Sequence, residues 1–195
     1  MQKNTKITGT DGGWLTGQML IAMPAMRDPR FVQSVIFLCA HSPEGAMGVV
    51  LNRPARGPKF PALLQRLGVQ PSPPLREVGM SAGGPVEESR GFVLHSPDWH
   101  GEASLDVDET YVLTGSLEIL TALAEGGGPE KARLMLGYAG WGAGQLESEI
   151  RENVWLIAPP DDSLVYDGLY TTKWQRALAK LKIEPGMLSG EVGRA

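Results

Sequence analysis

A continuous apolar run from Val35 to Ala40 constrains the fold of this chain more than any other feature. The run opens with β-branched and aromatic residues, which is typical of a strand covered on both faces. Ser42-Pro43-Glu44-Gly45 follows, with proline and glycine at the second and fourth positions of a turn. A second apolar run, 47–51, ends before Pro54. Together the two runs predict a β-hairpin in the interior of a sheet.

The rest of the chain predicts short elements joined by tight turns. Its 25 glycines and 15 prolines gather between apolar runs, which favours strands over long helices. Apolar spacing and capping residues predict further strands and four helices. The predicted strands are 91–95, 111–113, 133–138 and 154–158, and the predicted helices are 60–67, 116–124, 145–153 and 170–182. The segment 68–85, rich in proline and glycine, is predicted to be a loop.

These elements alternate in a way that predicts an α+β fold: one compact domain with a mixed, partly closed, barrel-like sheet flanked by helices. A chain of 195 residues is long enough for one core and short for two. We expect a loose N-terminal arm at 1–13, a single domain at 14–183 and a C-terminal tail at 184–195.

The single cysteine, Cys39, rules out an intramolecular disulfide and a zinc site built from several cysteines. No uncharged apolar stretch approaches the roughly 20 residues of a membrane span. We therefore expect a cytoplasmic protein without a membrane segment, a metal or a cofactor. His95 and His100 flank Asp98, but the three histidines of the chain lack the spacing of metal ligands.

Charge is distributed unevenly behind a net value of −4. Residues 1–90 carry 10 Lys/Arg and 6 Asp/Glu, residues 91–130 carry 0 and 8, and residues 131–195 carry 8 and 8. The acidic middle repels phosphate backbones, and no helix-turn-helix pattern is present. Lys173, Arg176 and Lys180 are expected on the solvated face of the last helix. Direct sequence-specific binding of DNA is therefore not expected.

Residues 79–83, Gly-Met-Ser-Ala-Gly, fit the nucleophile elbow of serine hydrolases. An elbow needs an apolar strand before the serine and a helix after it, but Arg76-Glu77 precede this segment and Gly84-Pro85 follow it. Cys39 and His41 are two residues apart on a predicted strand, which would place a thiol beside a base on one face. A cysteine in an apolar strand is more often an inert core residue, so we expect Cys39 to be buried and unreactive.

The glycine-rich segment 137–144 lies between a predicted strand and a predicted helix, where phosphate-binding loops occur. It matches neither the dinucleotide-binding spacing nor the P-loop. Two interpretations stay open: a ligand loop, or a close-packed turn in which glycine lets Trp141 and the backbone approach.

Three strand ends or turns are candidates for one ligand site. Glycine pairs expose backbone N–H groups, an arginine fork pairs with carboxylate or phosphate, and an indole offers an apolar platform. The candidate ligand-binding residues are Asn52, Arg53, Gly83, Gly84, Gly140, Trp141 and Gly142. Convergence of these residues would make a site for a small anion. In the alternative the glycines only allow close packing at corners of the sheet, and Arg53 pairs with a local carboxylate such as Glu147 or Glu149.

Placed end to end, several segments make the chain resemble the YqgE/AlgH family of bacterial proteins, from Leu20 to about Leu181. The segments that carry the resemblance are 20–24 (LIAMP) with 28–29 (DP), 45–48 (GAMG), 52–54 (NRP), 83–86 (GGPV), 90–92 (RGF) with 95–96 (HS), 137–141 (GYAGW), 144–147 (GQLE) and 155–156 (WL). The resemblance implies a compact α+β domain with a mixed, barrel-like sheet. The family is largely uncharacterised and often labelled a transcriptional regulator, and the resemblance supplies no catalytic residues.

The leading functional hypothesis is a non-enzymatic protein that binds a small anionic ligand or a protein partner and acts indirectly in regulation. The alternatives are an enzyme that acts on a small anionic substrate at the glycine loops and Arg53, and a DNA-binding protein. A cavity with a titratable pair would favour the enzyme, whereas an exposed apolar patch without one would favour an adaptor.

Overall fold

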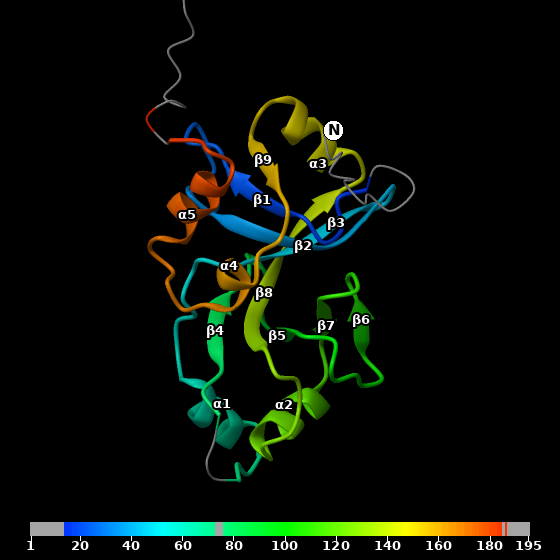
Figure 1. Ribbon diagram of the computed structural model, residues 1–195. Coiled ribbons are helices and arrows are strands. Elements are labelled where there is room, and N and C mark those ends of the chain that lie inside the picture. Colours follow the sequence, from blue (N-terminus) through cyan, green and yellow to red (C-terminus); the bar gives the residue numbers. More distant parts are fainter. Residues whose placement is uncertain (1–13, 73–75, 185, 187–195) are drawn as a thin grey trace, which may run out of the picture.

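The computed structural model describes residues 14–72, 76–184 and 186. It is an α+β domain in which a curled, half-barrel sheet is flanked by five helices (Figure 1). The strands are β1 (Met19–Ala22), β2 (Val35–Ser42), β3 (Gly45–Val50), β4 (Gly79–Ala82), β5 (Val86–His95), β6 (Ser104–Asp106), β7 (Val112–Thr114), β8 (Ala132–Gly142) and β9 (Trp155–Ala158). The helices are α1 (Phe60–Arg66), α2 (Leu117–Ala124), α3 (Gln145–Arg151), α4 (Asp162–Tyr166) and α5 (Lys173–Lys180). The predicted arm at 1–13 and most of the predicted tail lie outside the described residues.

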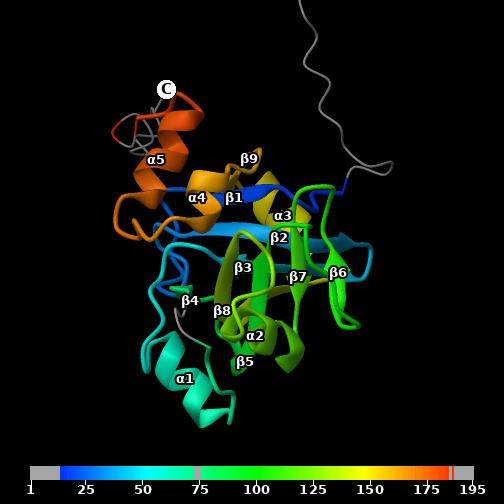
Figure 2. The same ribbon diagram turned by 60° about the horizontal axis from the view of Figure 1, so that its bottom comes forward.

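Strand β8 is the spine of the sheet. The strand order is β6-β7-β5-β8-β3-β2-β1-β9, with β4 paired to β8 off this path. The first half of β8 pairs with β5 and, in parallel, with β4, and its last residues pair with β3. β8 therefore runs through both halves of the molecule, and the two views of Figures 1 and 2 show it passing from the α1–α2 end towards β1, β2 and β3.

The predicted hairpin is present, as β2 and β3 joined at Ser42 and Gly45. Alternate residues of β2 enter two different hydrophobic clusters, as expected for a strand buried on both faces. The register shifts between Leu38 and Ala40, so Cys39 is the extra residue of a β-bulge. Beyond the bulge His41 faces α3, whereas Cys39 stays in the other cluster. The predicted common face for these two side chains is therefore wrong.

Three hydrophobic clusters make up the core. The largest lies inside the curl of the sheet and is closed by α4 and α5, through Leu164, Val165, Trp174, Ala177 and Leu178. The second lies on the opposite face of β1, β2 and β3 under α3. The third is covered by α1 and α2 at the far end of the molecule, which both figures separate from α5.

Several elements differ from the sequence prediction. Strand β4 lies in the segment predicted as a loop, and the prediction is wrong because parallel pairing with β8 stabilises a strand of low intrinsic propensity. Strand β8 runs to Gly142 rather than 138, since Gly45–Gly48 of β3 pair with its glycine-rich end. Strands β1 and β6 and helix α4 had no sequence prediction. Ser116 is the N-cap of α2 as predicted, although its hydroxyl makes no capping bond.

Helix α5 corrects the prediction for its basic residues. Lys173 is fully buried, and its Nζ donates to the carbonyls of Leu164 and Asp167 and to the Asp167 carboxylate. Arg176 donates to the same carboxylate at 2.5 Å. The lysine does not lie on a solvated face, because Leu164 and Asp167, which precede α5, enclose its ammonium group. Of the described helices, none is long and apolar enough to cross a bilayer.

Candidate functional site

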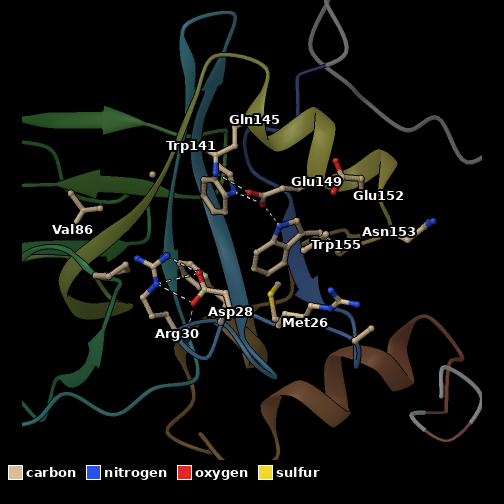
Figure 3. Close-up of a pocket in the computed structure, with 16 residues that line it drawn as sticks. Met26, Asp28, Arg30, Val86, Trp141, Gln145, Glu149, Glu152, Asn153 and Trp155 are labelled. Atoms are coloured by element: carbon tan, nitrogen blue, oxygen red, sulfur yellow. Dashed lines mark hydrogen bonds and ion pairs between the residues drawn. The ribbon is translucent and has the colours of Figure 1, made fainter. Parts of the chain in front are cut away.

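Two cavities bear on function, and the larger of these two, about 560 Å³, lies where the end of β8, α3 and the start of β9 meet residues 25–31 (Figure 3). Trp141 and Trp155 are 7% and 4% exposed, and their rings are edge to face with centroids 6.1 Å apart. Phe31 packs edge-on against Trp155 at 5.9 Å. Trp141 and Trp155 belong to the hydrophobic cluster beneath α3, and Phe31 packs against it, so one side of the cavity is formed by that cluster.

Glu149 fixes the two indoles. Its Oε2 accepts the indole N–H of Trp141 at 2.9 Å and that of Trp155 at 2.7 Å, and its Oε1 accepts Gln145 Nε2 at 2.8 Å. Figure 3 shows the carboxylate between the two rings. The crossover helix α3 thereby joins the end of β8 to the start of β9, which are separated by three strands in the sheet order. The aromatic wall is thus held in place before any ligand arrives.

Charged groups from residues 27–30 line the opposite side of the cavity. Asp28 accepts Nε and Nη2 of Arg30, and this pair lies below Trp141 in Figure 3. The hydrogen bond from Arg30 lowers the pKa of Asp28. Among the described residues, Arg27 has no hydrogen-bond or ion-pair partner, so its guanidinium remains available to a ligand.

A second cavity of about 330 Å³ lies between Asn52-Arg53, Val32-Gln33 and the residues at the start of α5. Asn52 pins the segment before β2, because its Oδ1 accepts the Val35 N–H and its Nδ2 donates to the Gln33 carbonyl. Arg53 Nη2 donates to the Val32 carbonyl at 3.1 Å. The same connection between β1 and β2 borders both cavities, with Phe31 in one and Val32 in the other.

The seven predicted ligand residues do not converge on one cavity. Gly140 and Trp141 line the larger cavity, while Asn52 and Arg53 line the smaller one. A Cβ on Gly83 would lie 2.3 Å from the Gly137 carbonyl oxygen, and one on Gly84 would lie 2.1 Å from the carbonyl carbon of Tyr138. These two glycines are needed for the close approach of backbones, as the packing alternative stated. Gly142 lines neither cavity.

The predicted pairing of Arg53 with Glu147 or Glu149 is also wrong. Glu147 lies 2.8 Å from His41 Nε2, and Glu149 takes the indoles. His41 Nδ1 accepts the Leu15 N–H, so the ring proton is on Nε2 and donates to Glu147. Both acids of α3 therefore have partners other than Arg53: Glu147 accepts His41, and Glu149 accepts the two indoles.

The candidate nucleophiles are enclosed. Ser81 is fully buried within β4, and its hydroxyl oxygen accepts Arg133 Nε at 2.8 Å. It is on a strand rather than at a strand-to-helix turn, contrary to the geometry of a nucleophile elbow. Cys39 is 1% exposed, as predicted, and burial raises its pKa to about 12.

His95 takes part in a buried hydrogen-bond chain instead of a metal site. Its Nδ1 donates to the Ser96 carbonyl at 2.8 Å, and its Nε2 accepts the Thr114 hydroxyl at 2.8 Å. Ser104 accepts the Gly101 N–H, and its hydroxyl donates to the Thr114 oxygen at 2.7 Å. Each hydroxyl in this series of hydrogen bonds thus donates once and accepts once. Burial lowers the pKa of His95, which favours the neutral ring.

Sequence reasoning missed Glu149 and Trp155 as parts of a site. Trp155 stands in one of the segments that carry the family resemblance, and Glu149 is one helical turn after Gln145 on α3. Nothing in their spacing indicates that both indoles meet one carboxylate, because the contact depends on the crossover of α3.

Comparison with known proteins places this architecture in a family. An AlgH-like family model matches residues 19–186. A UPF0301 protein of Rhodospirillum rubrum is 49% identical, over 94% of this chain and 95% of its own length, and one of Beijerinckia indica is 52% identical, over 96% of each. The solution structure of the AlgH protein from Pseudomonas aeruginosa superposes with a TM-score of 0.76 at 37% identity, covering 97% of this chain and all of that one. A Corynebacterium diphtheriae protein at 21% identity, with a TM-score of 0.67 over 90% of this chain and 92% of its own, shares the fold. The chain belongs to the AlgH-like family of UPF0301 proteins.

Proposed function

We propose that this protein binds a small organic molecule with a flat apolar body in the larger cavity, against the wall formed by Trp141 and Trp155, and that it does so without catalysis. The observation that carries the proposal is the aromatic wall of the cavity: Glu149 holds both indoles of this wall by hydrogen bonds, and the wall is part of a packed hydrophobic cluster. A volume of about 560 Å³ is within the range of ligand pockets, and a preformed wall lowers the entropic cost of binding.

The chemistry of the lining favours binding over reaction. Glu149 accepts three N–H groups, and Asp28 accepts Arg30, which lowers the pKa of Asp28, so both carboxylates are engaged by donors of the protein itself. The described residues that line the cavity include no serine, cysteine, histidine or lysine. The alternative of an enzyme at the glycine loops and Arg53 loses support because Gly83 and Gly84 are packed against β8.

A regulatory role would then be indirect and pass through the ligand or a protein partner. All eight carboxylates of residues 91–130 are exposed, and they oppose the approach of a nucleic acid. A partner could respond to the bound state through residues 23–34, which connect β1 to β2 and contribute residues 25–28, 30 and 31 to the lining of the cavity.

The proposal is tested by blocking the mouth of the cavity. Val86 lines it and is 36% exposed, so Val86→Trp fills space without disturbing the core. A set of aromatic fragments, neutral and charged, is screened by thermal shift. Fragments that raise the Tm of the native protein should lose that effect in Val86→Trp and keep it in the control Leu105→Trp, whose site is 46% exposed and lines neither cavity. Equal shifts in both variants would contradict the proposal.

A further inference from the structure

We propose that the smaller cavity is a separate anion site, in which Arg53 and the first turn of α5 bind the carboxylate or phosphate group of a small organic molecule. The site is independent of the ligand proposed above, because the two cavities share no lining residue.

Arg53 is the first reason. Its only side-chain hydrogen bond within the described part of the chain goes from Nη2 to the Val32 carbonyl. Its Nε is buried and has no partner there, and no carboxylate pairs with the guanidinium. A buried guanidinium N–H without an acceptor is costly, and a planar anion would satisfy it through the arginine fork.

The lining of the cavity is the second reason. Among the described residues that form it, Arg53 carries the only formal charge. Gln33, Thr171 and Gln175 contribute polar side chains for which no hydrogen bond within the described residues is present, so they can donate to a ligand. Tyr170 and Trp174 supply aromatic walls, and their own polar groups donate to the carbonyls of Met80 and Ala22. This is a set of available donors on an apolar wall, with no acid to repel an anion.

The surrounding charge also favours an anion. Thr172 at the N-cap of α5 makes no side-chain capping bond, and the first turn contains no acidic residue, so no side chain of this turn offsets the positive end of the helix. Arg133 is fully buried, and its Cζ lies 4.8 Å from the centre of the Tyr170 ring. Lys173 and Arg176 share the single carboxylate of Asp167, which leaves this region with an excess of positive charge.

The experiment uses phenyl phosphate and benzoate as probes, with benzyl alcohol as their neutral analogue. Binding is measured by titration calorimetry and by the indole N–H resonance of Trp174, which lines the cavity. We expect one or both anions to bind, the neutral analogue to bind more weakly, and the Trp174 resonance to shift. The tighter of the two anions shows which anionic group the site prefers.

Two substitutions test the residues. Arg53→Ala should weaken anion binding about tenfold or more, as expected for loss of a charge-assisted pair. Because Arg53 also holds the Val32 carbonyl, Gln175→Glu serves as a second variant: it adds an acid at an exposed position of the lining and should weaken binding about fivefold or more at low salt, without loss of fold. Gln175→Lys should strengthen it.

Arg56→Ala is the matched control, since Arg56 is exposed and lines neither cavity. It should bind the anions like the native protein, and so should Val86→Trp, which blocks only the larger cavity. The proposal is overturned if neither anion binds, if Gln175→Glu and Arg53→Ala bind like the native protein, or if Val86→Trp is the variant that loses binding. The last result would place the anion in the larger cavity and leave the proposed function intact.

Discussion

Replacing Glu149 with alanine should destabilise the protein and loosen the aromatic wall of the larger cavity. The carboxylate accepts the N–H groups of both Trp141 and Trp155, whose side chains are almost entirely buried. Removing it leaves two indole donors without an acceptor, and each such donor costs about 1–3 kcal/mol. Water in the adjacent cavity can satisfy part of this need, so we expect a loss of about 2–4 kcal/mol of unfolding free energy.

Glu149→Gln separates the acceptor from the charge. Both indoles donate to the same oxygen, Oε2, so an amide oxygen at that position can accept both of them. The charge assistance is lost, which is about half the strength of such bonds, and so is the bond from Gln145 Nε2, because an amide nitrogen replaces Oε1. The expected order of stability is therefore native, then Glu149→Gln, then Glu149→Ala.

Urea denaturation monitored by tryptophan fluorescence measures these differences. Glu152→Ala is the control on the same helix: Glu152 is exposed, and its side chain accepts one bond from Ser148, so its loss should change stability by less than about 0.5 kcal/mol. If Glu149→Ala is as stable as Glu152→Ala, the Glu149 carboxylate does not hold the two indoles in place and the reasoning is refuted.

Three further predictions concern buried groups. Lys173→Ala should cost about 2 kcal/mol or more, because it removes a fully buried ammonium from two backbone carbonyls and from its pair with a partly exposed carboxylate. Lys180→Ala, at a half-exposed pair, should cost less than about 1 kcal/mol in the same urea assay. Cys39 should react with a thiol reagent only at the rate of unfolding, since burial holds its pKa near 12; rapid labelling of native protein would contradict this. Because burial lowers the pKa of His95 in the fold, its contribution to stability is complete above the unfolded pKa of about 6.5 and is lost as pH falls through the folded value. Denaturation between pH 7 and 5 should therefore show a decline that His95→Gln reduces, and an equal decline in both proteins would be evidence against it.

The central hairpin, the α+β class and the burial of Cys39 were predictable because each depends on local pattern: a continuous apolar run, a proline–glycine turn and alternating side chains. Strand β4 was not predictable, because glycine and serine have low strand propensity and only the pairing with β8 makes the segment extended. The burial of Lys173 likewise depends on the turn that brings the Asp167 carboxylate to its ammonium group.

The candidate site was predictable only in parts. Trp141 and Arg53 were predicted to belong to one ligand site, but they line different cavities, because the segment between β1 and β2 passes between them. Glu149 became part of the site through the crossover of α3, a feature of topology that residue spacing does not encode.

The five tryptophan indole N–H resonances offer the most direct measurement of ligand binding in the larger cavity. Trp141 and Trp155 line it, Trp174 lines the smaller cavity, and Trp14 and Trp99 line neither. Titration of ¹⁵N-labelled protein with a fragment that raises its Tm should shift the Trp141 and Trp155 resonances, with saturation, and leave those of Trp14 and Trp99 unchanged. A stabilising fragment that leaves both Trp141 and Trp155 unshifted would contradict the account.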